Sequence, residues 1–142
     1  MNRVGRTFAL ALSASLLAGC AHLNTQVDRK AGIRGMKHLF VEHNLSDGRN
    51  LDQLIARELR KLGYDASAGP MTMMPDGTEA IIAYRDTWNF DFTNYLLELD
   101  IAVRTPGTGR EIAVGGYRHP SLLGTDPVAI VDKVLDPIFK QK

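Results

Sequence analysis

The side chain with the most specific chemistry in this sequence is the thiol of Cys20. It is the only cysteine among 142 residues, which excludes an intrachain disulfide framework and a cysteine-based zinc site. Before it, Arg3 and Arg6 precede an apolar run over residues 8–17 and then small residues. This order is typical of a secretory signal peptide. As a helix, the run of roughly ten residues is too short to cross a hydrocarbon core of about 30 Å.

The four residues that end at this cysteine form a motif. Leu17-Ala18-Gly19-Cys20 resembles the lipobox of bacterial lipoproteins at every position. The resemblance implies that the thiol of Cys20 receives a diacylglyceryl group, that a dedicated peptidase cuts before Cys20, and that the new amine is acylated. Ala21 stands where an aspartate usually retains Gram-negative lipoproteins in the inner membrane, so the resemblance is compatible with export to the outer membrane.

The segment after the motif is expected to be a tether. Residues 21–35 are polar and of mixed charge, with Gly32 and Gly35, which favours a flexible spacer between lipid and domain. The alternative is a first strand docked on the edge of the domain. We therefore divide the chain into a signal peptide at 1–19, a lipidated cysteine with its tether at 20–35, and a periplasmic domain at 36–142.

The composition fits a folded domain without a polyanionic partner. Hydrophobic residues make up 44% and charged residues 23%, which is typical of globular proteins and not of disordered chains. The net charge is +1, and loss of Arg3 and Arg6 with the signal peptide lowers it to −1. A nucleic-acid binder would be strongly basic, so we expect no nucleic-acid partner.

The sequence offers little for catalysis. Asp86, Asp91 and Asp100 are candidate acid–base carboxylates, but no histidine or nucleophile is placed to join them. The side-chain types of a hydrolase triad occur at Ser46, Asp47, His119 and Ser121. They lack the Gly-x-Ser-x-Gly elbow. We therefore expect a non-enzymatic protein with no catalytic residues and no cofactor.

A methionine-rich segment is the one candidate for a soft metal. Met71-Thr72-Met73-Met74 offers clustered thioethers that favour Cu(I), and His22 or His43 could add a nitrogen ligand. Methionine is also a flexible filler at the edge of a core. We favour packing and expect no metal.

Aromatic residues gather around one strand connection. We predict that this group includes a contact surface for a protein partner or glycan, because Trp and Tyr are favoured anchors; packing in the core is the alternative. The group consists of Tyr84, Trp88, Phe90, Phe92 and Tyr95.

The hydrophobic pattern predicts an α+β fold. We expect a two-layer sandwich, with a mixed sheet of four to five strands and two helices on one face, in the order β-α-β-β-β-β-α. The first helix should run from Leu51, behind a capping box at Asn50–Gln53, and end just before Gly63; the second should follow Asp126-Pro127. Gly115-Gly116 indicates a bulge or a close backbone approach. The strands are expected at 36–43, 64–68, 79–90, 94–105 and 111–119.

The mature part also resembles small uncharacterised proteobacterial periplasmic lipoprotein domains. Segments 45–51, 84–88 and 95–97 carry this resemblance. It suggests a lipid-anchored envelope lipoprotein at the outer membrane, whose domain faces the periplasm as a non-enzymatic interaction or assembly accessory. The expected partners are the membrane, through the lipid on Cys20, and an envelope protein. A ligand-binding module for a lipid or metal, and an unrecognised enzyme, remain alternatives.

Overall fold

The computed structural model describes residues 21–91, 93–119 and 124–140. Cys20, Phe92 and Ser121 therefore lie outside the described residues, as does the lipobox. Within the described ranges, no helix has the length and apolar character needed to span a membrane.

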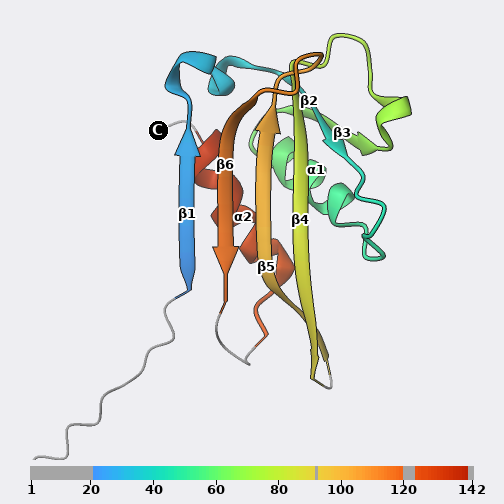
Figure 1. Ribbon diagram of the computed structural model, residues 1–142, viewed down its shortest axis with the longest axis vertical. Coiled ribbons are helices and arrows are strands. Elements are labelled where there is room, and N and C mark those ends of the chain that lie inside the picture. Colours follow the sequence, from blue (N-terminus) through green and yellow to red (C-terminus); the bar gives the residue numbers. More distant parts are fainter. Residues whose placement is uncertain (1–20, 92, 120–123, 141–142) are drawn as a thin grey trace, which may run out of the picture.

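The fold is a six-stranded mixed sheet in the order β1-β6-β5-β4-β2-β3, with both α-helices behind it (Figure 1). Strands β1, β6, β5 and β4 pair antiparallel, whereas β2 pairs parallel with both β4 and β3. The strands are β1 (His22–Val27), β2 (His38–Glu42), β3 (Asp65–Gly69), β4 (Ala80–Asp91), β5 (Thr93–Arg104) and β6 (Glu111–Arg118). The helices are α1 (Leu51–Lys61) and α2 (Pro127–Phe139), and the 3-10 turns are η1 (Arg29–Ala31), η2 (Ile33–Gly35) and η3 (Met71–Met73).

The α+β class is as predicted, but the sheet has one strand more than expected. The described part of the chain has the order β-β-α-β-β-β-β-α, because β1 precedes the predicted first strand. The prediction of a flexible tether at 20–35 is wrong for its described part, and the alternative of a docked strand is confirmed. Strand β1 pairs along its whole length with β6, from His22↔Arg118 to Val27↔Ala113. Backbone hydrogen bonds hold this edge strand, so its polar side chains gave no hydrophobic signal.

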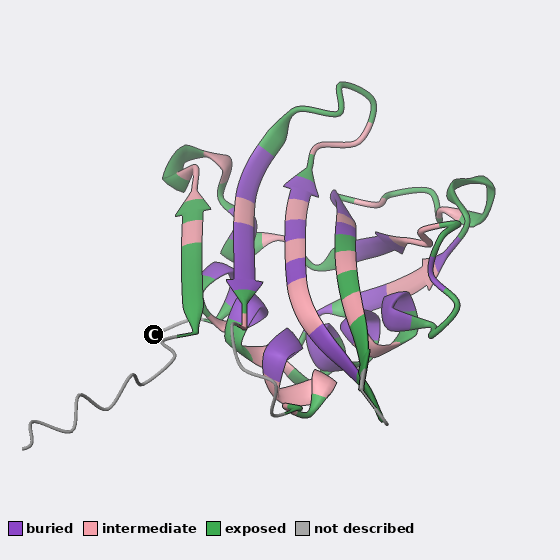
Figure 2. Ribbon diagram, turned by 60° about the horizontal axis from the view of Figure 1, so that its bottom comes forward, coloured by how far each residue is buried: buried purple, intermediate pink, exposed green. Residues whose placement is uncertain are grey.

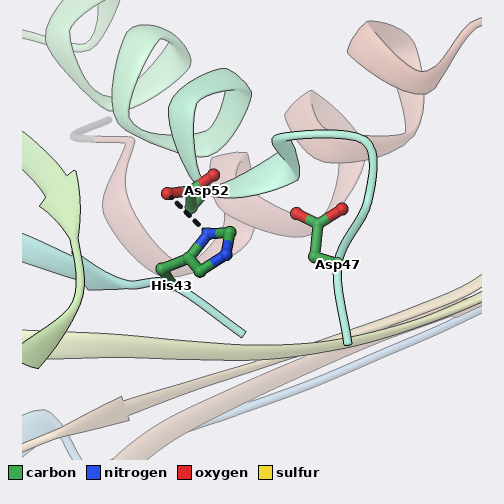
Figure 3. Close-up of side chains that lie close together, drawn as sticks. All are labelled: His43, Asp47 and Asp52. Atoms are coloured by element: carbon green, nitrogen blue, oxygen red, sulfur yellow. Dashed lines mark ion pairs between the residues drawn. The ribbon is translucent and has the colours of Figure 1, made fainter. Parts of the chain in front are cut away.

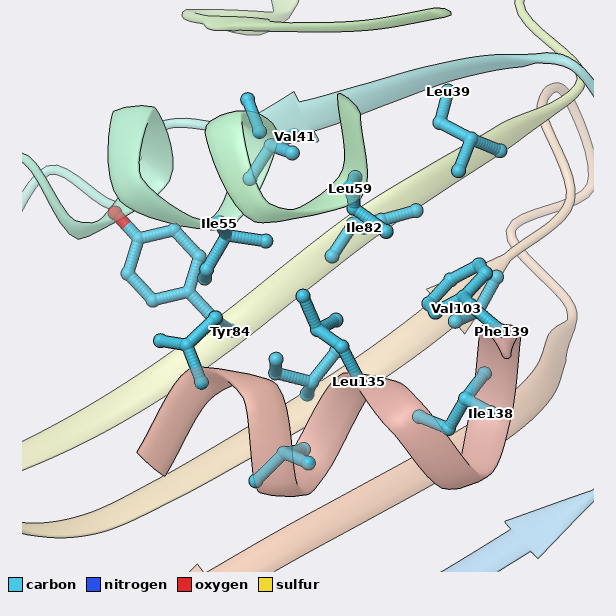
Figure 4. Close-up of a cluster of buried hydrophobic side chains, with 14 of the residues drawn as sticks. Leu39, Val41, Ile55, Leu59, Ile82, Tyr84, Val103, Leu135, Ile138 and Phe139 are labelled. Atoms are coloured by element: carbon cyan, nitrogen blue, oxygen red, sulfur yellow. The ribbon is translucent and has the colours of Figure 1, made fainter. Parts of the chain in front are cut away.

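Both helices cover one face of the sheet and share one core with it. Along much of β4 and β5, buried positions alternate with more accessible ones (Figure 2), as expected for strands with one covered face. Side chains of α1 and α2 meet those of β2, β4 and β5 in a single cluster (Figure 4). Its members include Leu39, Val41, Ile55, Leu59, Ile82, Tyr84, Val103, Leu135, Ile138 and Phe139.

Helix α2 approaches β6 most closely at Gly115. A Cβ atom there would lie 2.9 Å from Cγ1 of Val134 and 3.0 Å from Cδ1 of Ile138. Such distances are too short for a real side chain. The predicted close backbone approach at this glycine is therefore confirmed, and it explains why this position of β6 has no side chain.

The ends of the helices are built as predicted except at the start of α1. Gly63 has a left-handed φ of 96° directly after the C-cap of α1, and the carboxylate of Asp126 accepts the backbone N–H of Val128 at 3.1 Å. The capping box at Asn50–Gln53 is wrong: Asn50 is itself left-handed, with φ 56°, and its side chain makes no cap hydrogen bond. Asp47 supplies the cap instead.

Candidate functional site

Three titratable side chains converge where β2 meets α1. His43 follows β2, Asp47 lies in the loop before α1, and Asp52 lies in the first turn of α1 (Figure 3). One ligand-type atom from each lies within 4.8 Å of the others. The sequence did not predict this cluster. Its only signal was the pair Asp47 and Asp52, five residues apart at the start of a helix, and acids at such a position are common in ordinary turns.

Asp47 is buried and accepts hydrogen bonds on both of its carboxylate oxygens. Its Oδ2 accepts the hydroxyl of Tyr84 at 2.7 Å and the backbone N–H of Leu51 at 2.6 Å. Its Oδ1 accepts the backbone N–H of Arg49 at 2.7 Å. Burial raises the pKa of Asp47, but the hydrogen bonds from Tyr84 and from the backbone outweigh burial, so the net pKa is lowered. An ionised carboxylate therefore caps α1 and holds it against β4.

Tyr84 is the counterpart of this acid on the sheet. Burial and the hydrogen bond to Asp47 raise the pKa of its phenol well above the ordinary value. Its side chain is 7% exposed. Tyr84 therefore belongs to the core and to the cap of α1, and the prediction that places it in a partner-contact surface does not fit its burial.

Asp52 carries the incompletely satisfied group of the cluster. Its Oδ2 lies 3.2 Å from Nδ1 of His43, and its side chain is 3% exposed. Its Oδ1 is buried without a hydrogen-bond partner among the described residues. Such a group in a protein interior is costly and calls for an explanation. One imidazole and two carboxylates are ligand types that suit zinc or another divalent cation.

The aromatic group predicted as one contact surface is divided by the fold. Tyr95 is buried, and its hydroxyl accepts the side-chain amide of Asn89 at 2.9 Å. Trp88 is half-buried and donates its indole N–H to Asp86 at 2.6 Å. Phe90 is 71% exposed. Of the described members of the group, only Phe90 projects fully into solvent.

The other candidate residues do not converge on a reaction centre. The carboxylate of Asp86 binds the Trp88 indole, and Asp100 leans over Gly116, where an added Cβ would lie 2.7 Å from its Oδ1. His43, considered for copper, pairs its Nδ1 with Asp52. The exposed Met71 and Met73 belong to the η3 turn, and Ser121 lies outside the described residues.

A second pair of acids lies between the helices. Glu58 of α1 is 2% exposed and accepts both Lys61 and Arg57, at distances of 2.8–3.1 Å. Burial raises the pKa of Glu58, but these cations outweigh it and leave the pKa lowered. Burial and the nearby Glu58 carboxylate raise the pKa of Asp132 of α2. Because both acids serve the packing of one helix against the other, we interpret them as structural.

We predict that Asp132→Asn stabilises the protein at neutral pH. Because the pKa of Asp132 is raised in the folded state, the ionised carboxylate destabilises the folded protein at neutral pH. Below the unfolded-state pKa the carboxyl group is protonated in both states, and this destabilisation is absent. Removing the charge should raise Tm at pH 7 by about 2–4 °C. The gain should disappear near pH 3, and a gain of equal size at both pH values in a thermal melt would contradict the prediction.

Comparisons with known proteins show a fold and no family. No family model matches the chain, and no curated protein sequence matches it. Among solved structures, a PelC dodecamer from Paraburkholderia phytofirmans has a TM-score of 0.64 and 15% identity, and the match covers 86% of this chain and 100% of that one. A single-substitution variant of the same dodecamer has a TM-score of 0.62 and 16% identity, with 87% of this chain and 100% of that one covered. At these identities the likeness concerns the fold alone.

Proposed function

We propose that this chain is a lipid-anchored envelope lipoprotein that acts as a non-enzymatic interaction or assembly accessory at the outer membrane, with its domain facing the periplasm. The observation that carries the proposal is the motif Leu17-Ala18-Gly19-Cys20. Its cysteine is the only one in the chain, at the one position where lipid attachment requires a thiol.

The start of the folded domain supports an anchor close to the body. Only Ala21 separates Cys20 from His22, the first residue of β1. A lipid on Cys20 would therefore hold the domain at the membrane surface with almost no linker between them. Confinement to a surface raises the effective concentration of the domain for partners on the same membrane.

The architecture supports a role in assembly. The two solved structures compared above are dodecamers, and the sheet of this chain ends in two outer strands, β1 and β3. Outer strands leave backbone groups available to another chain. The partner that we propose is an envelope protein. Another copy of this chain is one such protein.

The proposal is tested by crosslinking in living cells, followed by purification of the membrane-bound chain and mass spectrometry. We expect an acylated N-terminal Cys20 and crosslinks to envelope proteins or to further copies. The control is the same chain secreted from Ala21 without a lipid. An unmodified Cys20, or no crosslinked protein above this control, would contradict the proposal.

A second candidate function is metal binding, favoured by the unpartnered Oδ1 of Asp52 beside His43 and Asp47. If it is correct, calorimetry should detect zinc binding by the purified chain at micromolar or lower concentration. His43→Ala should abolish that binding, whereas His38→Ala, which removes an exposed histidine on β2, should not. Equal heats for all three proteins would exclude this candidate.

A further inference from the structure

We propose that the tip of the β4–β5 hairpin is a second membrane contact, in which Phe90 enters the headgroup region of the bilayer that holds the lipid on Cys20. This inference rests on the proposed lipid anchor. It adds a second point of attachment, and with it an orientation of the domain relative to the membrane.

Strand register places the entry of the chain and the hairpin tip at the same end of the sheet. One row of paired residues crosses four strands there: His22, Arg118, Glu98 and Thr87. His22 is the first residue of β1, so the chain enters the sheet at this row. Strand β4 continues past the row to Asp91 before the chain turns back. Figure 1 shows the hairpin projecting beyond the rest of the sheet on the side where β1 begins.

Cys20 and Phe90 are separated from that row by similar lengths of chain. Cys20 precedes His22 by two residues, which can span at most about 7 Å of extended chain. Phe90 follows Thr87 by three residues of strand, which corresponds to about 10 Å. A lipid on Cys20 would therefore allow the bilayer surface to meet the hairpin tip.

Apolar side chains are exposed at this end. Phe90 is 71% exposed, Leu23 beside His22 is 47% exposed, and Leu45 in the loop after β2 is 93% exposed. Because β2 runs parallel to β4, that loop lies toward the same end as the tip. Phe and Leu are side chains with which peripheral proteins enter the boundary between headgroups and acyl chains. Exposed apolar groups spread around an anchor fit a flat lipid surface.

Side-chain contacts hold the stem of the hairpin against the rest of the domain. The guanidinium of Arg49 lies 4.5 Å from the centre of the Trp88 ring, and its Nη2 donates to Oδ1 of Asn94 at 3.3 Å. The indole of Trp88 donates to Asp86 at 2.6 Å on the same strand. These contacts connect the stem to the loop before α1, so the strand segment that carries Phe90 is held in place.

The test uses Trp88, the only tryptophan in the chain, as a reporter two residues from Phe90. The full lipidated protein is purified and bound to vesicles of phosphatidylethanolamine and phosphatidylglycerol, with either plain or brominated acyl chains. Bromine quenches indole fluorescence at short range. We expect Trp88 emission to be about twofold lower in brominated vesicles, because the tip lies at the boundary of the acyl chains.

Two variants locate the contact. Phe90→Ser should remove most of the quenching while the protein stays bound through its lipid. Met73→Ser, which removes an exposed apolar side chain from η3, should leave the quenching unchanged. A lipidated, vesicle-bound protein whose Trp88 is not quenched, or equal quenching in Phe90→Ser, would overturn this inference alone. A Cys20 that carries no lipid, detected by the mass of the purified protein, would instead contradict the proposed function.

Discussion

Asp47→Ala is expected to lower the free energy of unfolding by about 3 kcal/mol, measured by urea denaturation. The carboxylate caps α1 and accepts a hydroxyl and backbone N–H groups at 2.6–2.7 Å. Loss of an N-cap alone costs about 0.5–2 kcal/mol, and a hydrogen bond to a charged group contributes about 1.5–3 kcal/mol. Because a small domain has only about 5–15 kcal/mol of total stability, this one substitution should unfold a visible fraction of the protein under mild denaturation.

Two further variants test whether the loss of stability comes from the lost cap or only from removal of a negative charge. Tyr84→Phe removes only the hydroxyl that Asp47 accepts, so it should cost about 1 kcal/mol. Asp65→Ala removes a carboxylate that is 77% exposed and paired with His38, so it should change stability by less than about 1 kcal/mol. If Asp47→Ala unfolds at the same urea concentration as Asp65→Ala, the assigned role of Asp47 is wrong.

The stabilising effect of Asp47 should also depend on pH. Its pKa is lowered from the ordinary 3.8. A depressed folded-state pKa gives stability that is present above the unfolded pKa and is lost as the pH falls through the folded pKa. The difference between the wild type and Asp47→Ala should therefore be complete at pH 7 and shrink below about pH 4. Urea titrations at pH 7 and pH 3 measure this change, and a constant difference would contradict it.

Local sequence patterns predicted those helices and helix ends that are determined by residues within or next to the helix itself. Helix α1 follows from its apolar stripe and from Gly63, and the start of α2 follows from Asp126 and Pro127. The cap of α1 was missed because the capping carboxylate of Asp47 lies four residues before Leu51, whose N–H it accepts, and so falls outside the usual capping-box pattern. Strand β1 was predicted only as the alternative to a tether, because its partner, β6, lies about ninety residues away in sequence.

The aromatic group shows a different limit of sequence reasoning. Tyr84 and Phe90 both lie on β4 at positions that share one face under simple alternation. The register shifts between Thr87 and Trp88, and Figure 1 shows the hairpin continuing beyond the helices. Burial of Tyr84 and exposure of Phe90 depend on where the helices stop covering the strand. No pattern within the strand carries that information.

The largest expected change comes from removing the site of lipid attachment. If the chain is secreted from Ala21 behind an ordinary signal peptide, essentially all of it should leave the outer-membrane fraction and appear as soluble periplasmic protein. Three acyl chains on Cys20 would make release negligible, whereas even one acyl chain binds a membrane only reversibly. A single exposed Phe90 contributes far less apolar area than the lipid, so the hairpin should not retain the protein by itself.

Two point variants make this prediction specific to the lipobox. Cys20→Ser should leave an uncleaved precursor that still carries residues 1–19, because the resemblance implies that cleavage requires the lipidated thiol. Ala21→Asp should keep lipidation and cleavage but shift the protein to the inner membrane on a sucrose gradient. Normal cleavage and outer-membrane recovery of Cys20→Ser would show that the thiol has no part in anchoring, and the domain would then need another route to the membrane.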